Sequence, residues 1–154
     1  MNSNTDSTYQ KRPKETVSKN MSKIRSSDTE IERMVRSNLW KIGYRYRKNY
    51  SRLPGKPDIV FVRERVAIFC DSDFWHGRDW STLKKRLRTN PEYWIPKIER
   101  NRERDKKVSQ ELALMDWTII RIWESDIKKD LDACVQRIVS TVESKRKDIR
   151  SKVE

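Results

Sequence analysis

Apolar residues recur at helical spacing near the start of the chain. The stripe is typical of an amphipathic helix and consists of Ile31, Met34, Val35 and Leu39. Ser27-Asp28-Thr29-Glu30 precedes it as a capping box, with a serine N-cap and a glutamate three residues later. Gly43 supplies a C-terminal stop. The pattern predicts a helix of about 15 residues.

Short apolar runs in the middle of the chain predict strands. Residues 44–47 alternate with a period of two, and residues 49–57 read as a loop. Residues 59–62 and 66–70 are almost entirely apolar on either side of a charged turn, which indicates two neighbouring strands buried on both faces. Residues 117–123 are rich in β-branched and aromatic side chains and predict a further strand.

Two more helices follow from the spacing in the second half. Asn90 and Pro91 have the pattern of an N-cap and a proline at the first helical position, and Pro96 predicts a kink or a fresh start. A stripe over residues 97–115 places Asn101 and Asp105 on its inward face, where a structural and a functional role are both open. Apolar residues at helical spacing over 131–142 predict the final helix.

The predicted order of elements is a helix, three strands, a helix, a strand and a helix. A hairpin followed by a strand that returns across a helix implies an α/β fold, with a mixed central sheet flanked by helices. We expect a disordered basic N-terminal arm over residues 1–17, a single domain over residues 18–145 and a charged tail over residues 146–154.

Composition adds a strong positive charge to this picture. The 154 residues include 36 Lys and Arg against 23 Asp and Glu, a net charge of +13. This excess predicts binding to a polyanion such as nucleic acid, the alternative being a basic protein with an unrelated role. No run reaches the roughly 20 apolar residues of a membrane span. With two distant cysteines and no apolar leader, we expect a cytoplasmic, nucleoid-associated protein rather than a secreted one.

Acidic residues and the only histidine lie at one end of the predicted hairpin. Asp58 precedes the first apolar run, whereas Asp71, Asp73 and His76 follow the second. Carboxylates that meet there can hold Mg²⁺, and a neighbouring imidazole can act as a general base. The arrangement resembles nucleases of the PD-(D/E)xK type, although the usual lysine two residues after the second acid is missing.

Several motifs in one order make the chain similar to the Vsr-type DNA mismatch endonucleases of very short patch repair. The motifs are Ser18-Lys19-Asn20-Met21, Asp28-Thr29-x-Ile31-Glu32, Leu53-Pro54-Gly55-Lys56-Pro57-Asp58, Ile68-Phe69, Phe74-Trp75-His76, Glu92-Tyr93-Trp94, Lys97-Ile98, Asn101, Arg104-Asp105 and Ile122-Trp123-Glu124. The resemblance implies a restriction-endonuclease-like core. It also implies Mg²⁺-dependent nicking of one strand beside a T·G mismatch left by deamination of 5-methylcytosine.

The resemblance also implies roles for residues of the site. Asp58 would be the central metal ligand, and Cys70 would offer its backbone carbonyl to the same metal. His76 would be the general base, oriented by Glu32 from the first helix. Asp71 stands where the best-known member of the family has a second histidine, so that it would bind metal directly or through water.

A further set of residues is implied to bind DNA: Met21, Phe74, Trp75, Trp94, Lys19 and Asn101. Phe74 and Trp75, joined by Trp94, would be a wedge that enters the base stack at the mismatch, while Met21 would press from the minor-groove side. Unstacking costs least at a mismatch, which is one route to selectivity. The alternative for Trp75 is packing in the core.

The chain departs from the familiar form of the family, which carries a structural zinc bound by Cys and His. Those positions here are Asp73, Arg78, Trp80 and Ser125, so we expect no structural zinc and a loop held by Trp80 packing and salt bridges. The expected partner is double-stranded DNA with a T·G mismatch, bound by a monomer with a functional link to a cytosine-5 DNA methyltransferase. The alternatives are a restriction-type or other repair nuclease of the same fold, and a non-catalytic DNA-binding module.

Overall fold

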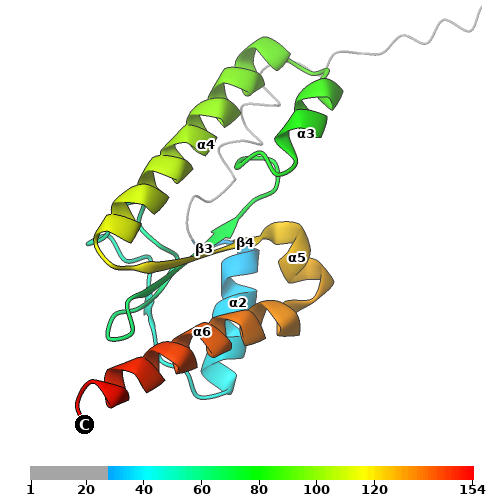
Figure 1. Ribbon diagram of the computed structural model, residues 1–154. Coiled ribbons are helices and arrows are strands. Elements are labelled where there is room, and N and C mark those ends of the chain that lie inside the picture. The colour runs from blue at the N-terminus through cyan, green and yellow to red at the C-terminus, as the bar shows by residue number, and fades with distance from the viewer. Residues whose placement is uncertain (1–27) are drawn as a thin grey trace, which may run out of the picture.

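The computed structural model describes residues 28–154, and these form one sheet with helices on both of its faces (Figure 1). The elements are α2 (Glu30–Lys41), β1 (Arg47–Lys48), β2 (Ile59–Phe61), β3 (Val66–Asp71), α3 (Trp80–Arg86), α4 (Pro91–Leu114), β4 (Thr118–Trp123), α5 (Glu124–Lys129) and α6 (Leu131–Ser151). The expectations for the N-terminal arm, Lys19 and Met21 lie outside the described residues.

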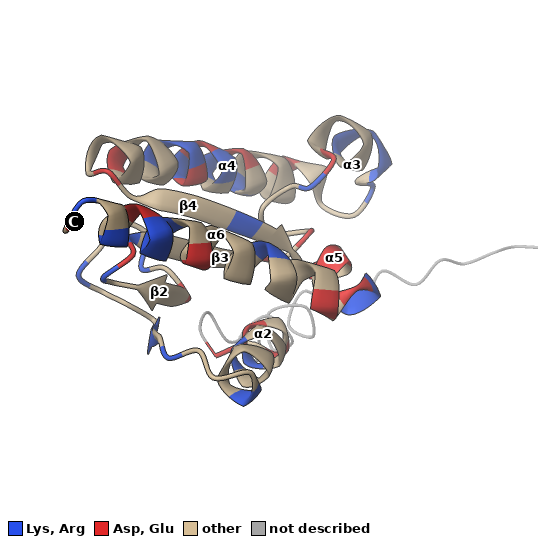
Figure 2. Cartoon of the chain, turned by 60° about the horizontal axis from the view of Figure 1, so that its bottom comes forward, with Lys and Arg blue, Asp and Glu red and all other residues tan. Residues whose placement is uncertain are grey.

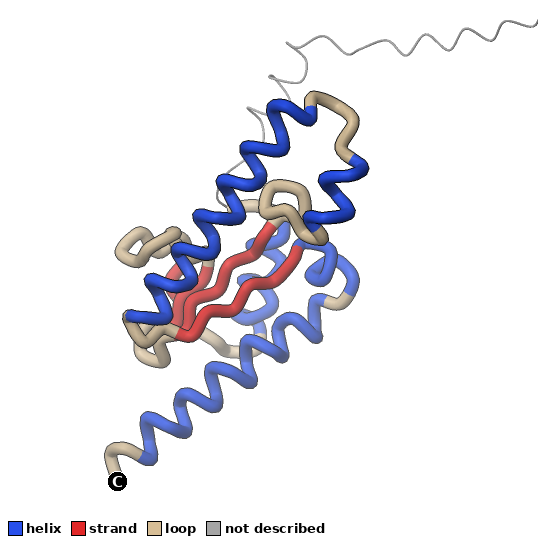
Figure 3. Tube along the Cα trace, turned by 45° about the horizontal axis from the view of Figure 1, so that its top comes forward, coloured by secondary structure: helices blue, strands red, loops and turns tan. Residues whose placement is uncertain are grey.

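The sheet is mixed, as the order of elements predicted. Its strands lie in the order β1-β2-β3-β4. The β2–β3 hairpin is antiparallel, whereas β4 runs parallel to β3 after the chain has crossed the sheet through α4 (Figure 3). In this register Ile59 pairs with Ile68, and Asp71 pairs with Trp123. The beginning of β2 and the ends of β3 and β4 therefore meet at one edge of the sheet.

Both faces of the hairpin strands are covered, which confirms the prediction from their continuous apolar runs. Every residue of β2 and β3 is buried. One face packs against α2, α5 and α6 through side chains such as Val35, Ile127 and Ile138, and the other packs against α4 through Leu112. In Figure 2, α4 lies above the strands and α2 lies below them. Burying each large aliphatic side chain contributes roughly 1.5–3 kcal/mol.

The first helix begins later than predicted. Its N-cap is Thr29 rather than Ser27, and the Thr29 side chain accepts a hydrogen bond from the backbone N–H of Glu32. The Glu32 carboxylate in turn accepts from the backbone N–H of Asp28 at 2.8 Å. Because the capping hydroxyl comes from Thr29, the helix begins at Glu30 and has 12 residues. The predicted stop is confirmed, since Gly43 follows the helix with φ of +96°.

The expectation of a strand over residues 44–47 is largely wrong. Strand β1 contains only Arg47 and Lys48, because Tyr44 and Tyr46 turn inward and pack edge to face on Phe61, with ring centroids 6.3 Å apart in each pair. Alternation of tyrosine and arginine marked the buried and exposed sides correctly. Most of the segment lacks a pairing partner in the sheet.

The later helices also differ in detail from the prediction. Asn90 is the N-cap of α4 and Pro91 its first residue, as expected, but α4 continues through Pro96 and no second helix starts there. Met115, the last member of the predicted inward stripe, is exposed. Helix α6 continues to Ser151, through part of the segment predicted to be a charged tail. None of the described helices is both long and apolar enough to cross a membrane.

Candidate active site

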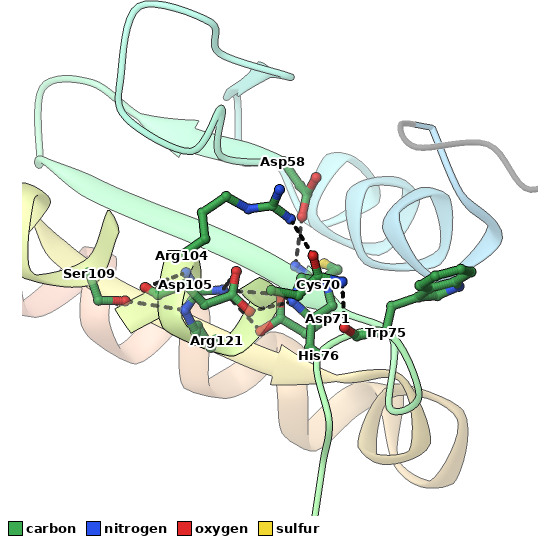
Figure 4. Close-up of polar contacts among 10 residues, drawn as sticks. Asp58, Cys70, Asp71, Trp75, His76, Arg104, Asp105, Ser109 and Arg121 are labelled. Atoms are coloured by element: carbon green, nitrogen blue, oxygen red, sulfur yellow. Dashed lines mark hydrogen bonds and ion pairs between the residues drawn. The ribbon is translucent and has the colours of Figure 1, made fainter. Parts of the chain in front are cut away.

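A cleft of about 1030 Å³ opens at the edge of the sheet where β2 begins and β3 ends. Its walls include Glu32 from α2, Asp58 from the start of β2, Asp71 from the end of β3, and His76 from the following loop. Helix α4 adds Asp105 from the opposite side (Figure 4). The structure therefore brings together Asp58, Asp71 and His76, as the sequence predicted, whereas Asp73 lies outside the cleft and accepts a hydrogen bond from Ser125.

Asp58 is held in place by the backbone of the neighbouring strand. The backbone N–H of Cys70 donates a hydrogen bond to Asp58 Oδ2 at 2.7 Å. Burial, followed by the proximity of Glu32 and Asp71, raises the pKa of Asp58 to about 7, although the bond from Cys70 acts in the opposite direction. Among residues 28–154, no Lys or Arg forms an ion pair with Asp58. A buried carboxylate with such neighbours is stabilised by a bound cation.

Glu32 is buried beside Asp58 but is neutralised from its own helix. Arg36 Nη1 lies 3.3 Å from Glu32 Oε2, one turn further along α2, and Arg36 also forms an ion pair with Asp28. No hydrogen bond or ion pair joins Glu32 to His76 within residues 28–154, so the expectation that Glu32 orients His76 stays a prediction. The carboxylate of Glu32 is turned toward Arg36 and the N-terminus of α2, whereas the carboxylate that holds His76 comes from α4.

His76 makes its shortest polar contact with Asp105. His76 Nδ1 lies 2.6 Å from Asp105 Oδ2 and 3.8 Å from Asp71 Oδ1. We assign the proton to Nδ1, which donates it to Asp105 and leaves Nε2 as an acceptor. Burial lowers the pKa of His76, but the hydrogen bond to Asp105 and the charges of Asp71 and Asp105 outweigh it and raise the pKa above its ordinary value of 6.5.

Asp71 is paired with an arginine rather than left open for a metal ion. Arg121 Nη1 lies 3.2 Å from Asp71 Oδ1 and 3.0 Å from Asp71 Oδ2 (Figure 4). Burial raises the pKa of Asp71, while His76 and Arg121 oppose this shift. Of Glu32, Asp58, Asp71 and Asp105, Asp58 is thus the acid that lacks a cationic side-chain partner within residues 28–154.

The three aromatic residues expected to form a wedge lie together beside the cleft. Phe74, Trp75 and Trp94 pack edge to face, with centroids 5.4–5.6 Å apart. Trp94 is buried, whereas Phe74 and Trp75 are partly exposed. The backbone carbonyl of Trp75 accepts a hydrogen bond from Asn101 Nδ2 at 3.0 Å. Asn101, expected to contact DNA, therefore holds the loop that carries the aromatic residues.

The same loop is tied to the start of α5 by polar contacts. Arg78 pairs with Asp126 at 3.1 Å and donates to the Ser125 hydroxyl, while the backbone N–H of Ser125 donates to Asp73 at 3.3 Å. The Arg102 guanidinium lies 6.0 Å from the ring centroid of Trp80. Asp73, Arg78 and Ser125, three of the four positions where the resemblance would imply zinc ligands, thus form one hydrogen-bonded group here.

Two residues that line the cleft had no role assigned from the sequence, Asp105 and Arg121. Asp105 was visible as a polar residue on the inward face of a helix, but its partner was not. Arg121 is the only charged residue within the apolar strand β4, and such a residue needs a buried or partly buried counter-ion. That signal was available in the sequence, although it did not identify Asp71.

The sequence of this chain is similar to those of known endonucleases. The family model for the DNA mismatch endonuclease Vsr matches residues 9–82. The type II nicking enzyme V.NmeDIP of Neisseria meningitidis serogroup C is 38% identical over 126 residues, covering 82% of this chain and 85% of the relative. V.HpaIIP, a type II nicking enzyme of Haemophilus parainfluenzae, is 42% identical over 106 residues, which are 69% of this chain and 75% of the relative.

The DNA mismatch endonuclease Vsr of Escherichia coli K12 is 36% identical over 115 residues, covering 75% of this chain and 73% of that protein. Sequence identity of 36–42% over most of this chain and of each relative confirms the resemblance to Vsr-type endonucleases that the sequence motifs indicated. The matched segments include the acids at the ends of the hairpin strands. The chain belongs to the Vsr family of DNA mismatch endonucleases.

Proposed function

We propose that this protein is an endonuclease that nicks one strand of duplex DNA beside a T·G mismatch, with Mg²⁺ as its cofactor. The observation that carries the proposal is a cleft lined both by Asp58, which has no counter-ion among residues 28–154, and by a histidine held by Asp105. Family membership supports mismatch nicking as the reaction. The T·G specificity and the choice of metal are our inference.

The donor set fits a hard divalent cation. Asp58 and the Cys70 carbonyl are oxygen donors, which Mg²⁺ prefers. Burial raises the pKa of Asp58 to about 7, which supports a bound cation as the partner of its ionised form. When bound there, the cation lowers the pKa of a water molecule and stabilises charge on the phosphate.

The proton and the phosphate have candidate acceptors in the chain itself. His76 Nε2 would take the proton of the attacking water, while Asp105 keeps Nδ1–H in place and stabilises the imidazolium. The lysine usual in PD-(D/E)xK nucleases is absent from its position. Lys56, Lys97 and Arg104 line the same cleft, and we propose that they stabilise the phosphate instead.

The aromatic cluster gives a route to mismatch selectivity. Phe74 and Trp75 are partly exposed beside the cleft, and a wobble pair unstacks more readily than a matched pair. We propose that they enter the base stack with Trp94 behind them. Lys19 and Met21 remain proposed DNA contacts from the segment before residue 28.

We further propose that the enzyme needs no structural zinc. The contacts among Asp73, Arg78, Ser125 and Asp126 support this, because they already join the loop to α5. Metal analysis of tag-free protein should find less than about one zinc per ten chains, since a structural site retains its metal through purification. One tightly held zinc per chain would contradict the proposal.

The proposed cellular role follows from the substrate. T·G pairs arise where 5-methylcytosine deaminates, so we propose a functional link to a cytosine-5 DNA methyltransferase, with the enzyme acting as a monomer on DNA in the cytoplasm. The proposed metal ligand, the proposed base and the aromatic cluster all come from one chain, which supports the monomer.

A nicking assay on a panel of duplexes tests the proposal. T·G pairs in varied flanking sequences and matched controls are incubated with Mg²⁺, each strand carrying its own label. We expect a single nick on the T strand beside the mismatch in a subset of contexts. Cleavage of both strands of matched DNA would favour a restriction-type nuclease. Binding without cleavage in any context, with either Mg²⁺ or Mn²⁺, would favour a non-catalytic module.

A further inference from the structure

Arg121 is an unusual residue for its place in the fold. It lies in the middle of β4, whose other residues are apolar or threonine, and its side chain reaches into the cleft (Figure 4). The guanidinium lies 4.3 Å from the ring centroid of Phe69. An arginine so placed loses hydration, and only strong polar contacts offset that loss.

Those contacts are made to the two acids beside His76. Arg121 Nη1 contacts both carboxylate oxygens of Asp71, Nη2 donates to the backbone carbonyl of Asp105 at 3.3 Å, and Nε donates to the Ser109 hydroxyl at 3.3 Å. Arg121 Nη1 also lies 3.8 Å from Asp105 Oδ1. One side chain therefore fixes the end of β3 against one face of α4.

The residues around this guanidinium have the composition of a metal site. Ligand atoms of Asp71, His76 and Asp105 all lie within 4.8 Å of one another. An imidazole with two carboxylates suits zinc and related transition metals better than Mg²⁺. A metal on this triad would occupy a nitrogen of His76 and would compete with its proposed role as a base.

We propose that Arg121 is a positioning residue that takes the place of a second cation. Its guanidinium neutralises Asp71, closes the Asp71–His76–Asp105 triad to metal, and leaves His76 to act as the base. The inference rests on the proposed function for its catalytic consequence. The closure of the triad does not rest on it, since the ion pair exists whatever the substrate.

The only histidine of the chain gives a direct readout. Nitrogen-15 NMR of tag-free protein reports the two ring nitrogens of His76 during a zinc titration. We expect no zinc-induced change in the wild type and a large shift of one ring nitrogen in Arg121→Met. Binding of zinc by His76 in the wild-type protein would overturn the proposal. This result is decisive even if the Arg121→Met variant fails to fold, because it comes from the wild-type protein.

A double variant tests whether the Arg121–Asp71 ion pair, which closes the triad to metal, also affects the rate of nicking. Removing Arg121 should slow single-turnover nicking by about 10- to 100-fold, because the neighbouring Asp71 charge is then unbalanced. Asp71→Asn in the Arg121→Met background should abolish the zinc response and restore nicking to within about fivefold of wild type. Arg121→Lys should retain part of the activity. A double variant no faster than Arg121→Met would overturn the positioning role.

Arg137→Met is the matched control. Arg137 donates from α6 to the backbone carbonyl of Arg121 at 3.2 Å and lies outside the cleft. Its loss removes one charge and one hydrogen bond at the same strand, and it should change neither the zinc response nor the rate. Failure of the wild type to nick any duplex would refute the proposed function, and the zinc titration would still decide whether Arg121 closes the triad.

Discussion

The four acids Glu32, Asp58, Asp71 and Asp105 in the cleft differ in their nearest polar partners, and this difference separates their proposed roles. Glu32 is paired with Arg36, Asp71 with Arg121, and Asp105 with His76. Asp58 receives a backbone hydrogen bond from Cys70, and no Lys or Arg among residues 28–154 forms an ion pair with it. A cation at Asp58 would complete the set. This is the physical reason to assign the metal to Asp58.

The raised pKa of Asp58 predicts how stability depends on pH without metal. Between the ordinary value of 3.8 and about 7, the folded state retains a proton that the unfolded chain has lost. The free energy of unfolding therefore falls as pH rises through this window, by as much as about 4 kcal/mol. Asp58→Asn should remove this fall and melt above the wild type near neutral pH, but not near pH 4.

Thermal melting in EDTA and in Mg²⁺ checks this prediction. Mg²⁺ should raise the melting temperature of the wild type and leave that of Asp58→Asn unchanged. Asp116→Asn, in the exposed turn after α4, is the control for loss of one acid. Equal pH dependence in the wild type and Asp58→Asn would show that another group controls it.

His76 and Asp105 should differ in their effect on the pH profile of nicking. His76→Ala should lose about 10²- to 10⁴-fold, the usual cost of removing a general base. In the wild type the rate should rise as His76 deprotonates, above its ordinary pKa of 6.5 because Asp105 and Asp71 raise that pKa. Asp105→Asn should lower the rate and move the rise to lower pH. An unchanged profile in Asp105→Asn would refute the His76–Asp105 pair.

The residues of the site were predictable only where local rules apply. An antiparallel hairpin brings the start of one strand beside the end of the next, so the proximity of Asp58 and Asp71 followed from the sequence. The Arg36–Glu32 pair also has ordinary helical spacing. The contacts of Asp105 with His76 and of Arg121 with Asp71 join residues 29 and 50 positions apart, and they depend on where α4 packs and how β4 aligns with β3.

At the scale of elements, the loop between β3 and α3 connects the proposed wedge to the proposed base. It carries Phe74, Trp75 and His76, and it rests on α4 through Gly77. Gly77 has φ of +63°, and a Cβ there would lie 2.8 Å from Ile98 Cγ2 and from Arg102 Cδ. A glycine is thus needed both for its backbone conformation and for its close approach to α4.

Gly77→Ala should therefore destabilise the fold by about 2–4 kcal/mol and slow nicking roughly 10- to 100-fold, since His76 lies next to it. Gly43→Ala is the matched control, because Gly43 also has a positive φ but a Cβ there would meet no atom within 4 Å. It should cost about 1–2 kcal/mol and leave the rate unchanged. Denaturant unfolding and single-turnover nicking measure the two effects, and equal results for both variants would contradict the contact with α4.

The elements themselves were predictable where they bury a stripe or a run. Helices α2, α4 and α6 and strands β2, β3 and β4 each have that signal. Helix α3 has no buried residue, so no periodic pattern marked it between residues 80 and 86. The strand predicted over residues 44–47 was too long, because the packing of Tyr44 and Tyr46 on Phe61 produces the same alternation as a strand.

At the scale of the molecule, the net charge of +13 predicts strongly salt-dependent binding to DNA. Each phosphate contact lowers the slope of log affinity against log salt by about 0.9. Lys85, Arg86 and Arg88 are exposed on and just after α3, beside the wedge loop. Changing all three to glutamine should reduce the magnitude of the slope by about 2–3.

The control for this charge effect lies at the other end of the molecule. The C-terminal end of α6 is far from α3 (Figure 1), and it carries Lys147, Arg150 and Lys152. Changing these three to glutamine removes the same charge and should change the slope by less than about 1. Equal slopes for the two triple variants would show that α3 makes no specific contact with the DNA backbone.

The single-turnover rate of nicking at a T·G pair, measured for the wild type and Asp58→Asn with Mg²⁺ and with EDTA, tests the central claim most directly. We predict a nick on one strand for the wild type in Mg²⁺ only. Asp58→Asn should show no nick in either condition, while it binds the duplex within about threefold of wild type, because phosphate contacts supply most of the affinity. Nicking by Asp58→Asn near the wild-type rate, or by the wild type in EDTA, would contradict the assignment of Asp58 as the metal ligand of a Mg²⁺-dependent mismatch endonuclease.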